Sequence, residues 1–123
     1  MLTVSVKKRF RDIVGDAGFI SGDAALEVYE CDGYTLARSR PELVLLPSTT
    51  DQVRRAVALC HEQSIPFVPR GAGTGLSGGC LPEKIPVMIG TARMRRIRSI
   101  DLANRAIEVE AGVVNLEVTR RTA

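Results

Sequence analysis

Residues 69–82, PRGAGTGLSGGCLP, concentrate the residue types that could bind an anion through the protein backbone. Five of the nine positions from Gly71 to Gly79 are glycine. Glycine permits left-handed backbone dihedrals and carries no side chain, so successive N–H groups can converge on a negatively charged group. The hydroxyls of Thr74 and Ser77 add two further donors. The stretch predicts a cradle for a phosphate or pyrophosphate; the alternative is a surface loop or tight crossover without a ligand.

Two familiar phosphate-binding loops do not fit this stretch. The ATP-type loop ends in Gly-Lys-Ser/Thr, and no lysine follows these glycines until Lys84. The dinucleotide pattern G-x-G-x-x-G is present as Gly73, Gly75 and Gly78, but it requires a helix that begins inside the loop. Pro82 follows closely and leaves no room for that helix before the next apolar run. We therefore expect a strand–loop–strand cradle that relies on backbone amides.

The composition is that of one ordinary globular domain, with 123 residues, 45% hydrophobic and 25% charged. The net charge of +3 is accompanied by only 4% aromatic residues, so we expect no nucleic-acid partner. Three widely spaced cysteines and a single histidine, His61, favour reduced thiols and exclude a histidine-rich metal site. No secretion signal precedes the first helix, and no apolar run reaches membrane-spanning length. We expect a cytoplasmic protein without a bound metal.

Two segments have the spacing of amphipathic helices. Residues 5–15 place apolar side chains at intervals of four and three, and glycines follow that end the helix. Residues 48–64 carry the same pattern after a polar start that resembles a capping box. The candidate capping pairs of this second helix are Thr49 with Gln52 and Ser48 with Asp51.

Short apolar runs of strand length surround the second helix. They cover residues 42–47, 65–69 and 85–90. The first two, with the helix between them, predict a right-handed β-α-β unit over residues 42–69. Residues 21–42 are polar and rich in turn-forming residues, so we expect an irregular connection there.

The last third of the chain predicts a hairpin followed by the start of a helix. Residues 94–101 and 105–112 flank the turn sequence DLAN, and the second segment alternates with period two, which predicts one wet face. Its apolar residues are Ile107 and Val109, and its acidic residues are Glu108 and Glu110. Asn115 is placed to cap a helix that reaches Ala123, and we expect the chain to be cut within that element. These elements predict a fold of the α+β or α/β class, and we expect α+β.

The sequence from about residue 38 onward resembles a known family. PELVLLPSTTDQVRRAVALCHEQSIPFVPRGAGTGLSGG, followed by IDLANRAIEVEAGV, is similar to the start of the FAD-binding domain of the vanillyl-alcohol oxidase and p-cresol methylhydroxylase flavoproteins. The likeness is strongest to their D-2-hydroxy-acid branch, which holds the glycolate oxidase D subunit, D-lactate dehydrogenases and D-2-hydroxyglutarate dehydrogenases. It implies the N-terminal lobe of a PCMH-type FAD-binding domain, built from the β-α-β unit, the glycine loop and further strands. It divides the chain into residues 1–37, an N-terminal helix and connection, and residues 38–123, the first and incomplete part of that domain.

The resemblance also implies roles for single residues, because in that family the strand–loop–strand wraps the FAD pyrophosphate. Backbone contacts to the pyrophosphate are implied for Gly71, Ala72, Gly73, Thr74 and Gly75. Places beside the ribityl chain or the flavin ring are implied for Ser77, Gly78 and Gly79. Pro47 would border the adenine, Arg70 would brace the loop, and EAGV at 110–113 resembles the family's return strand near the cofactor.

Two departures from the family pattern carry further expectations. Members that attach their flavin covalently through this loop often have histidine where this chain has Thr74, so the resemblance implies non-covalent FAD. Family members also continue into a second glycine-rich FAD segment and a substrate domain. Oxidation of a 2-hydroxy acid needs a base and a cationic clamp for the carboxylate, and neither can be assigned within these residues. We expect a truncated chain that holds half a cofactor site and is inactive alone.

The resulting hypothesis is the FAD-binding portion of an oxidoreductase that oxidises a D-2-hydroxy acid resembling glycolate or D-lactate. The implied partners are FAD, the small 2-hydroxy acid, an iron–sulfur or other redox subunit, and a second copy of the chain joined through open strand edges. Two alternatives stay open: a stand-alone anion- or nucleotide-binding module without redox activity, and a basic interaction domain. The basic stretch at 7–11 is either a contact to a membrane surface or a solvated helix face. The basic stretch at 91–99 is either a patch for phosphate, an acidic partner or membrane headgroups, or a solvated face.

Overall fold

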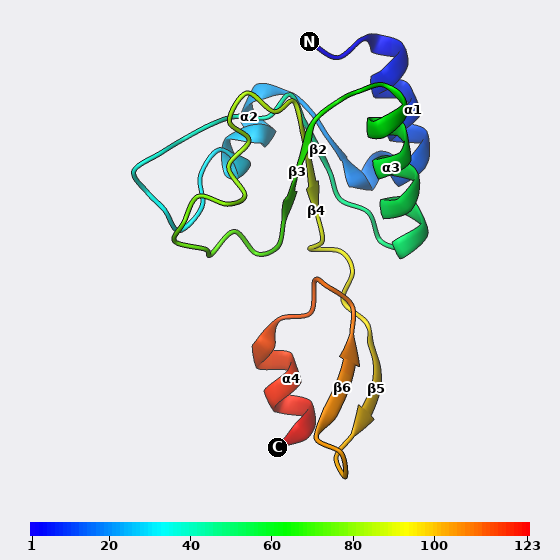
Figure 1. Cartoon of the computed structure of the whole chain (residues 1–123), viewed down its shortest axis with the longest axis vertical. Coiled ribbons are helices and arrows are strands. Elements are labelled where there is room, and N and C mark those ends of the chain that lie inside the picture. The colour runs from blue at the N-terminus through cyan, green and yellow to red at the C-terminus, as the bar shows by residue number, and fades with distance from the viewer.

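The computed structural model describes all 123 residues, which form two parts of unequal size (Figure 1). The larger part holds a four-stranded sheet with helices beside it, and the smaller part is a two-stranded hairpin with one helix. The elements are α1 (Val4–Val14), η1 (Asp16–Gly18), β1 (Phe19–Ile20), α2 (Asp23–Leu26), η2 (Glu27–Tyr29), β2 (Leu43–Leu45), α3 (Thr50–Glu62), β3 (Phe67–Arg70), β4 (Val87–Gly90), β5 (Ile97–Asp101), β6 (Ala106–Val109) and α4 (Asn115–Thr122).

Both predicted amphipathic helices form, with side-chain caps at their starts. The Thr3 hydroxyl accepts a hydrogen bond from Val6 N at the start of α1, and Gly15, with φ of 73°, ends this helix. The predicted capping box of α3 is confirmed for one of its two candidate pairs: Thr49 Oγ1 accepts from Gln52 N at 3.2 Å, and Gln52 Oε1 accepts from Ser48 N at 2.7 Å. Asp51, from the other pair, instead forms an ion pair with Arg54.

The four-stranded sheet has the order β1-β2-β4-β3. The strands β2 and β3 both run parallel to β4, and β1 pairs antiparallel with β2. The strands at the two ends of the predicted β-α-β unit are therefore parallel, but β4 lies between them. The handedness of this crossover stays a prediction.

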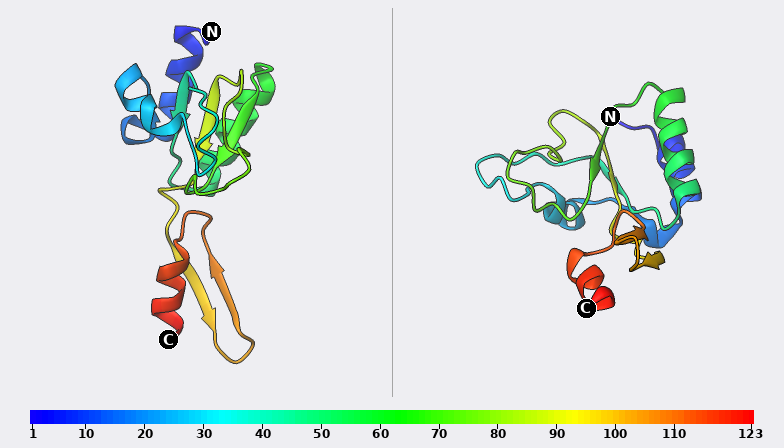
Figure 2. Two further views of the ribbon diagram at one scale, coloured as in Figure 1. Left: turned by 90° about the vertical axis from the view of Figure 1, so that its left-hand side faces the viewer. Right: turned by 60° about the horizontal axis from the view of Figure 1, so that its bottom comes forward.

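The sheet is covered on both faces, which explains why its strands are continuous apolar runs. One set of strand residues packs against α1 and α3 (Figures 1 and 2); this core contains Val6, Phe10, Val14, Leu43, Leu45, Ala56, Leu59, Cys60, Val87 and Ile89. The alternate residues face the other way and form a smaller core of Leu26, Val44, Val68 and Met88. Because α1 shares the larger core with the strands, the predicted division at residue 37 separates segments that pack together.

The segment expected to be irregular contains more structure than its sequence indicated. Residues 21–42 include α2 and η2, and Leu26 of α2 is buried against the second face of the sheet. The two-residue strand β1 just before them pairs with β2. Elements this short carry no readable periodicity, and the long-range contacts that stabilise them are invisible in the local sequence.

The hairpin of β5 and β6 forms, and the predicted alternation holds for Ile107, which is half-buried, and Glu108, which is exposed, but is reversed at the next two residues. The side chain of Glu110 is 2% exposed, whereas Val109 is 38% exposed. Glu110 follows β6 and its carboxylate accepts hydrogen bonds from the backbone and guanidinium of Arg96 at 2.8–2.9 Å, which compensates its burial. Two smaller predictions were also wrong: residues 110–113 form no strand but contain a turn at Ala111 and Gly112, and Asn115 is the first residue of α4 and makes no capping bond.

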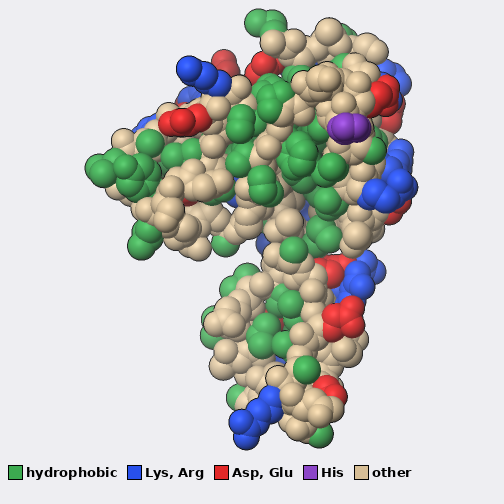
Figure 3. Space-filling model, viewed as in Figure 1, with side chains coloured by type: hydrophobic (Ala, Val, Ile, Leu, Met, Phe, Trp, Pro, Cys, Tyr) green, Lys and Arg blue, Asp and Glu red, His purple; other side chains and the backbone are tan.

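The two parts meet at a narrow waist (Figure 3). There Gly112 N donates to Met94 O at 2.8 Å, and the Thr91 hydroxyl donates to Ala111 O at 3.2 Å. A Cβ atom at Gly112 would collide with the carbonyls of Thr91 and Met94, so only glycine lets the two connecting segments approach this closely. None of the helices is both long enough and apolar enough to span a membrane.

Candidate functional site

The glycine-rich loop leaves the sheet at the carboxyl end of the edge strand β3 and returns at the start of β4 (Figure 1). Ligands of open parallel sheets bind outside the carboxyl ends of the strands. The strand β3 ends at Arg70, and Gly71 is the first residue of the loop. The parallel sheet therefore presents residues 71–79 where a ligand site is expected.

The hydrogen bonding of the loop is one-sided. No N–H group of residues 71–79 donates to a carbonyl of the chain. Several carbonyls of the loop, in contrast, face the protein: Gly73 O accepts from Gly33 N at 3.1 Å, and Gly78 O accepts from Leu81 N at 3.0 Å. Because none of the nine N–H groups donates to a carbonyl of the chain, nine backbone donors remain available to a ligand that can accept several hydrogen bonds, as an anion does.

The glycines of the loop fall into two classes. At Gly71, Gly75 and Gly79 an added Cβ atom would find no heavy atom within 4 Å, so glycine here keeps open space beside the backbone. Gly73 and Gly78 have φ of 72° and 71°, in the left-handed region that other residues rarely adopt. Open space, free N–H groups and left-handed turns together fit a pyrophosphate, whose oxygens must approach the backbone closely.

Arg70 lies at the base of this loop and makes four kinds of contact with its surroundings. Its Nη1 donates to Cys31 O at 2.9 Å and to Cys80 Sγ at 3.7 Å. Its Cζ lies 5.7 Å from the centre of the Tyr29 ring, a cation–π distance. An added Cβ at Gly73 would lie 2.5 Å from the same Cζ, so the guanidinium also fills the inner side of the loop. Arg70 forms no direct ion pair, and the carboxylate nearest in this network, that of Asp32, contacts the same Cys80 sulfur.

The other predicted site residues differ in how accessible they are. Gly71, Ala72, Thr74, Gly75, Ser77 and Gly79 are exposed, and Arg70, Gly73 and Gly78 are half-buried. The structure thus brings nine of the ten predicted residues into one loop and its base. Pro47 is the exception: it is fully buried after β2 and offers no surface in this chain, and its contact with adenine stays a prediction.

The cysteine beside the loop is not a strongly activated thiol. Cys80 Sγ donates to Asp32 Oδ2 at 3.5 Å. Burial raises the pKa of the Cys80 thiol, the nearby Arg70 charge acts in the opposite direction, and the Asp32 carboxylate raises it further. Its thiol therefore acts as a hydrogen-bond donor within the fold.

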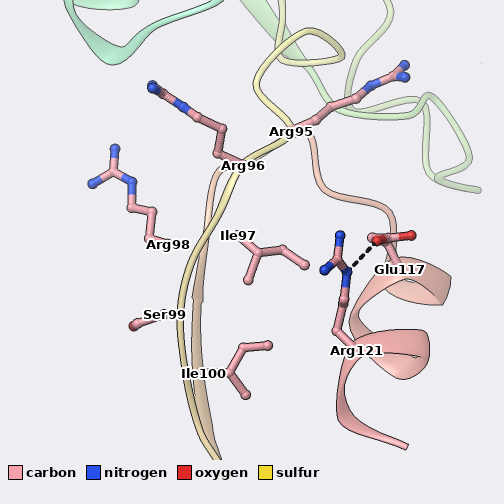
Figure 4. Close-up of a pocket in the computed structure, with 8 residues that line it drawn as sticks. All are labelled: Arg95, Arg96, Ile97, Arg98, Ser99, Ile100, Glu117 and Arg121. Atoms are coloured by element: carbon pink, nitrogen blue, oxygen red, sulfur yellow. Dashed lines mark hydrogen bonds and ion pairs between the residues drawn. The ribbon is translucent and has the colours of Figure 1, made fainter.

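The arginine cluster at 93–98 forms a separate cleft between β5 and α4, with a volume of about 480 Å³ (Figure 4). Ile97 and Ile100 point toward α4, while Arg96 and Arg98 point away from it. Arg96 and Arg98 pair with Glu110 and Glu108 of the hairpin segment, and Arg121 pairs with Glu117 one turn away on α4. The charges of these three arginines are compensated within the fold, whereas Arg93 and Arg95 donate only to the backbone carbonyls of Leu46 and Ala92. The three compensated charges favour a solvated face over an anion site.

Sequence reasoning missed the segment that lies directly behind the loop. Gly33 approaches it so closely that an added Cβ would lie 2.7 Å from Gly75 O and 2.8 Å from Thr74 O. Asp32, next to it, is 8% exposed, and its Oδ1 accepts from Tyr34 N at 2.8 Å. The Asp-Gly pair signals a turn, but nothing in the local sequence tells that this turn contacts residues forty positions further along.

The chain is similar to several known proteins. Glycolate oxidase subunit GlcD of Escherichia coli strain K12 is 40% identical over 119 residues, which cover 97% of this chain and 24% of that protein. D-lactate dehydrogenase of Anaerostipes hadrus is 31% identical over 114 residues, covering 92% of this chain and 24% of that protein. The solved structure of p-cresol methylhydroxylase with substrate bound matches with a TM-score of 0.83 at 23% identity, over 95% of this chain and 24% of that one.

These findings confirm the resemblance and the α+β fold expected from the sequence. The structural likeness shows that the fold is shared, and the chain spans about a quarter of the length of the curated relatives it matches. Residues 41–123 match the family described as FAD binding domain. The glycine-rich loop at residues 71–79 lies within the matched range, and its contact with the pyrophosphate of FAD stays a prediction. This chain belongs to the FAD binding domain family, and its cofactor is FAD.

Proposed function

We propose that this chain supplies the pyrophosphate-binding part of the FAD site in an oxidoreductase that acts on a D-2-hydroxy acid such as glycolate or D-lactate. The observation that carries the proposal is the run of nine backbone N–H groups without a carbonyl acceptor in residues 71–79. The substrate class rests on the relatives, which are named as a glycolate oxidase subunit and a D-lactate dehydrogenase.

The role of these residues is to bind and orient rather than to react. The N–H groups of the loop donate to pyrophosphate oxygens, and the exposed hydroxyls of Thr74 and Ser77 add donors beside them. The guanidinium of Arg70 places a fixed positive charge behind the loop, which favours binding of a dianion. When bound, FAD supplies the hydride acceptor for oxidation of the alcohol carbon. Because Thr74 cannot form the bond that a histidine forms, FAD is held without a covalent link.

The chemical step requires groups that this chain does not provide. A base must take the hydroxyl proton of the substrate, and a cationic side chain must hold its carboxylate. The chain has one histidine, His61, which is exposed on α3 away from the loop. We therefore propose that the 123 residues bind FAD without turnover, and that residues elsewhere in the complete enzyme supply the base and the clamp.

The remaining partners are proposed on the same basis. An iron–sulfur or other redox subunit would take the electrons from the reduced flavin of the complete enzyme. The enzyme is proposed to work in the cytoplasm. The basic face of α1 is proposed to make peripheral contact with a membrane. Self-association is proposed through the outer edges of the β5–β6 hairpin. The four-stranded sheet offers less: its edge strand β1 has only two residues, and its other edge strand, β3, contains Pro69, which cannot donate to a neighbouring strand. Light scattering that shows only monomers would refute this association.

The function is tested by incubating the purified chain with FAD, removing free FAD by desalting and recording the visible spectrum. We expect flavin to be retained by the chain and lost from a Gly71→Leu variant, in which the larger side chain enters the open side of the loop. Ala58→Leu is the control variant, because Ala58 is an exposed residue of α3 in the opposite layer. It should retain as much flavin as the unsubstituted chain.

Two further experiments distinguish the proposed flavin site from a stand-alone nucleotide-binding module. Titration with ADP and with riboflavin tells a general nucleotide site from a flavin site: ADP binding with no preference for FAD would support a stand-alone nucleotide-binding module. The same measurements on a chain extended beyond Ala123 test whether a second segment completes the site. If neither chain retains FAD, the proposed function is wrong.

A further inference from the structure

The glycine-rich loop cannot define its own shape, because its N–H groups make no hydrogen bonds to carbonyls of the chain. Glycine also has more conformational freedom to lose than any other residue. A loop of this kind binds a ligand tightly only if something else holds it in the bound shape beforehand, since ordering it at the moment of binding lowers affinity. The structure places one neighbouring segment where it can do this.

Residues 29–34, which we call the strap, contact the loop at its start, middle and end. At the start, Arg70 Nη1 donates to Cys31 O at 2.9 Å, and its guanidinium lies over the Tyr29 ring. In the middle, Gly33 N donates to Gly73 O at 3.1 Å. At the end, Cys80 Sγ donates to the Asp32 carboxylate at 3.5 Å. The strap therefore fixes both ends of the loop and one of its left-handed glycines.

Asp32 occupies the centre of these contacts. Its two carboxylate oxygens accept separate hydrogen bonds, Oδ1 from Tyr34 N and Oδ2 from Cys80 Sγ. The residue is 8% exposed, so this carboxylate is bound into the fold and does not face solvent as a ligand group would. It joins the turn of the strap to the residue that closes the loop.

Gly33 contributes by its lack of a side chain. An added Cβ would lie 2.8 Å from Thr74 O and 2.7 Å from Gly75 O, distances that force backbone to move. Its φ is not in the left-handed region, so a substitution acts through this contact and not through strain at Gly33 itself. The strap thus contacts the carbonyl groups of Gly73, Thr74 and Gly75, and the N–H groups of the loop remain free to bind a ligand.

We propose that the strap is a positioning element that holds the glycine loop in its pyrophosphate-binding shape, with Asp32 and Gly33 as positioning residues. This inference rests on the proposed function of the loop. None of the strap residues needs to touch FAD; they act through Arg70, Gly73 and Cys80. The predicted consequence is that changes behind the loop weaken binding of FAD and ADP while leaving the fold intact.

Two readouts test the proposal in the purified chain. The first is the dissociation constant for FAD and for ADP. The second needs no cofactor: it is the rate of tryptic cleavage after Arg70, divided by the rate after Arg105, an exposed residue in the hairpin turn. Trypsin must take the arginine side chain into its own pocket, so cleavage at Arg70 reports release of this side chain from the strap.

We expect Gly33→Ala to raise the dissociation constant for both ligands about tenfold, the size of one lost hydrogen bond with its geometry. The cleavage ratio should rise by a similar factor. Cys80→Ala should change both readouts in the same direction. Cys80→Ser keeps a hydrogen-bond donor, so its dissociation constants and cleavage ratio should stay close to those of the unsubstituted chain. The control is Asp12→Asn on the exposed face of α1, which should change neither. Circular dichroism and thermal unfolding confirm that each variant is folded.

The outcomes separate this inference from the function on which it rests. Binding of FAD and ADP that is unchanged in folded Gly33→Ala and Cys80→Ala variants, with an unchanged cleavage ratio, would overturn the role of the strap alone. A rise in cleavage without loss of affinity would also overturn it, because the loop would then bind without being held. If the unsubstituted chain, also when extended beyond Ala123, binds neither ligand, both proposals fail together.

Discussion

The substitution Gly75→Ala should raise the stability of the chain and lower its affinity for FAD at the same time. An added Cβ at Gly75 meets no heavy atom within 4 Å, and the φ of this residue is outside the left-handed region. Alanine can therefore adopt the native backbone without a clash. The methyl group, however, occupies the open side of the loop where the pyrophosphate is proposed to lie.

The two effects have magnitudes that follow from this geometry. Replacing glycine by alanine at a compatible position stabilises the fold by about 0.4–1 kcal/mol, because the unfolded chain loses conformational freedom. For a domain of this size that raises the Tm by roughly 1–5 °C. Displacing a pyrophosphate oxygen from one backbone N–H group removes a hydrogen bond to a charged acceptor, about 1.5–3 kcal/mol. That corresponds to a dissociation constant for FAD about 10- to 150-fold higher.

Thermal unfolding without cofactor and a fluorescence titration with FAD measure the two effects separately. The matched comparison is Gly73→Ala, where φ is 72° and the new Cβ would lie 2.5 Å from Arg70 Cζ, so both stability and affinity should fall. If Gly75→Ala lowers the Tm, the open space beside residue 75 is not present in solution. If its affinity for FAD stays within twofold of the original, the pyrophosphate does not bind on this side of the loop.

Three other predictions concern the fold. Phe10 is fully buried in the larger core, so Phe10→Ala should lower the free energy of unfolding by about 3–5 kcal/mol in urea titrations, and a loss below 1 kcal/mol would contradict the packing of α1. Burial raises the pKa of the Cys60 thiol to about 11, above its ordinary value. The stability that the buried thiol contributes is therefore present below pH 9 and lost as pH rises through about 11. A Cys60→Ala variant should show less alkaline destabilisation, and the native Cys60 thiol should react with Ellman's reagent more slowly than Cys31. Hydrogen bonds from the Arg96 side chain, and then from its backbone, lower the pKa of Glu110, so its contribution is present at neutral pH and lost as pH falls below the ordinary range of a carboxyl group. Glu110→Gln should flatten the acid limb of the stability profile, and an unchanged acid limb would show that the pair contributes nothing.

The sequence was sufficient for the elements whose signals are local. The helices α1 and α3 follow from apolar spacing and caps, and the strands from short apolar runs closed by proline and glycine. The position of the glycine-rich loop between two strands follows from its composition and flanking apolar runs, while its role as a phosphate cradle stays a prediction. These features could be predicted because each depends on residues that are close together in the sequence.

The parts that could not be predicted depend on distant partners. Alternation placed Glu110 on the wet face, but its burial is decided by Arg96, which pairs with it across the hairpin. The insertion of β4 between β2 and β3 is set by pairing in the sheet and leaves no mark in any one strand. The strap was assigned to an irregular connection because its contacts reach residues 39 to 48 positions away.

A loop that makes almost no bonds of its own has a consequence for how substitutions in it would be observed. Screens for abundance or protease resistance would tolerate many replacements at Gly71, Gly75 and Gly79, because the folded chain loses no contact there. Screens for flavin content would reject the same replacements. Both kinds of screen should reject large replacements of Gly33, which lies behind the loop. Comparing two such maps of the same chain would therefore outline the footprint of the cofactor residue by residue, before any complex has been seen.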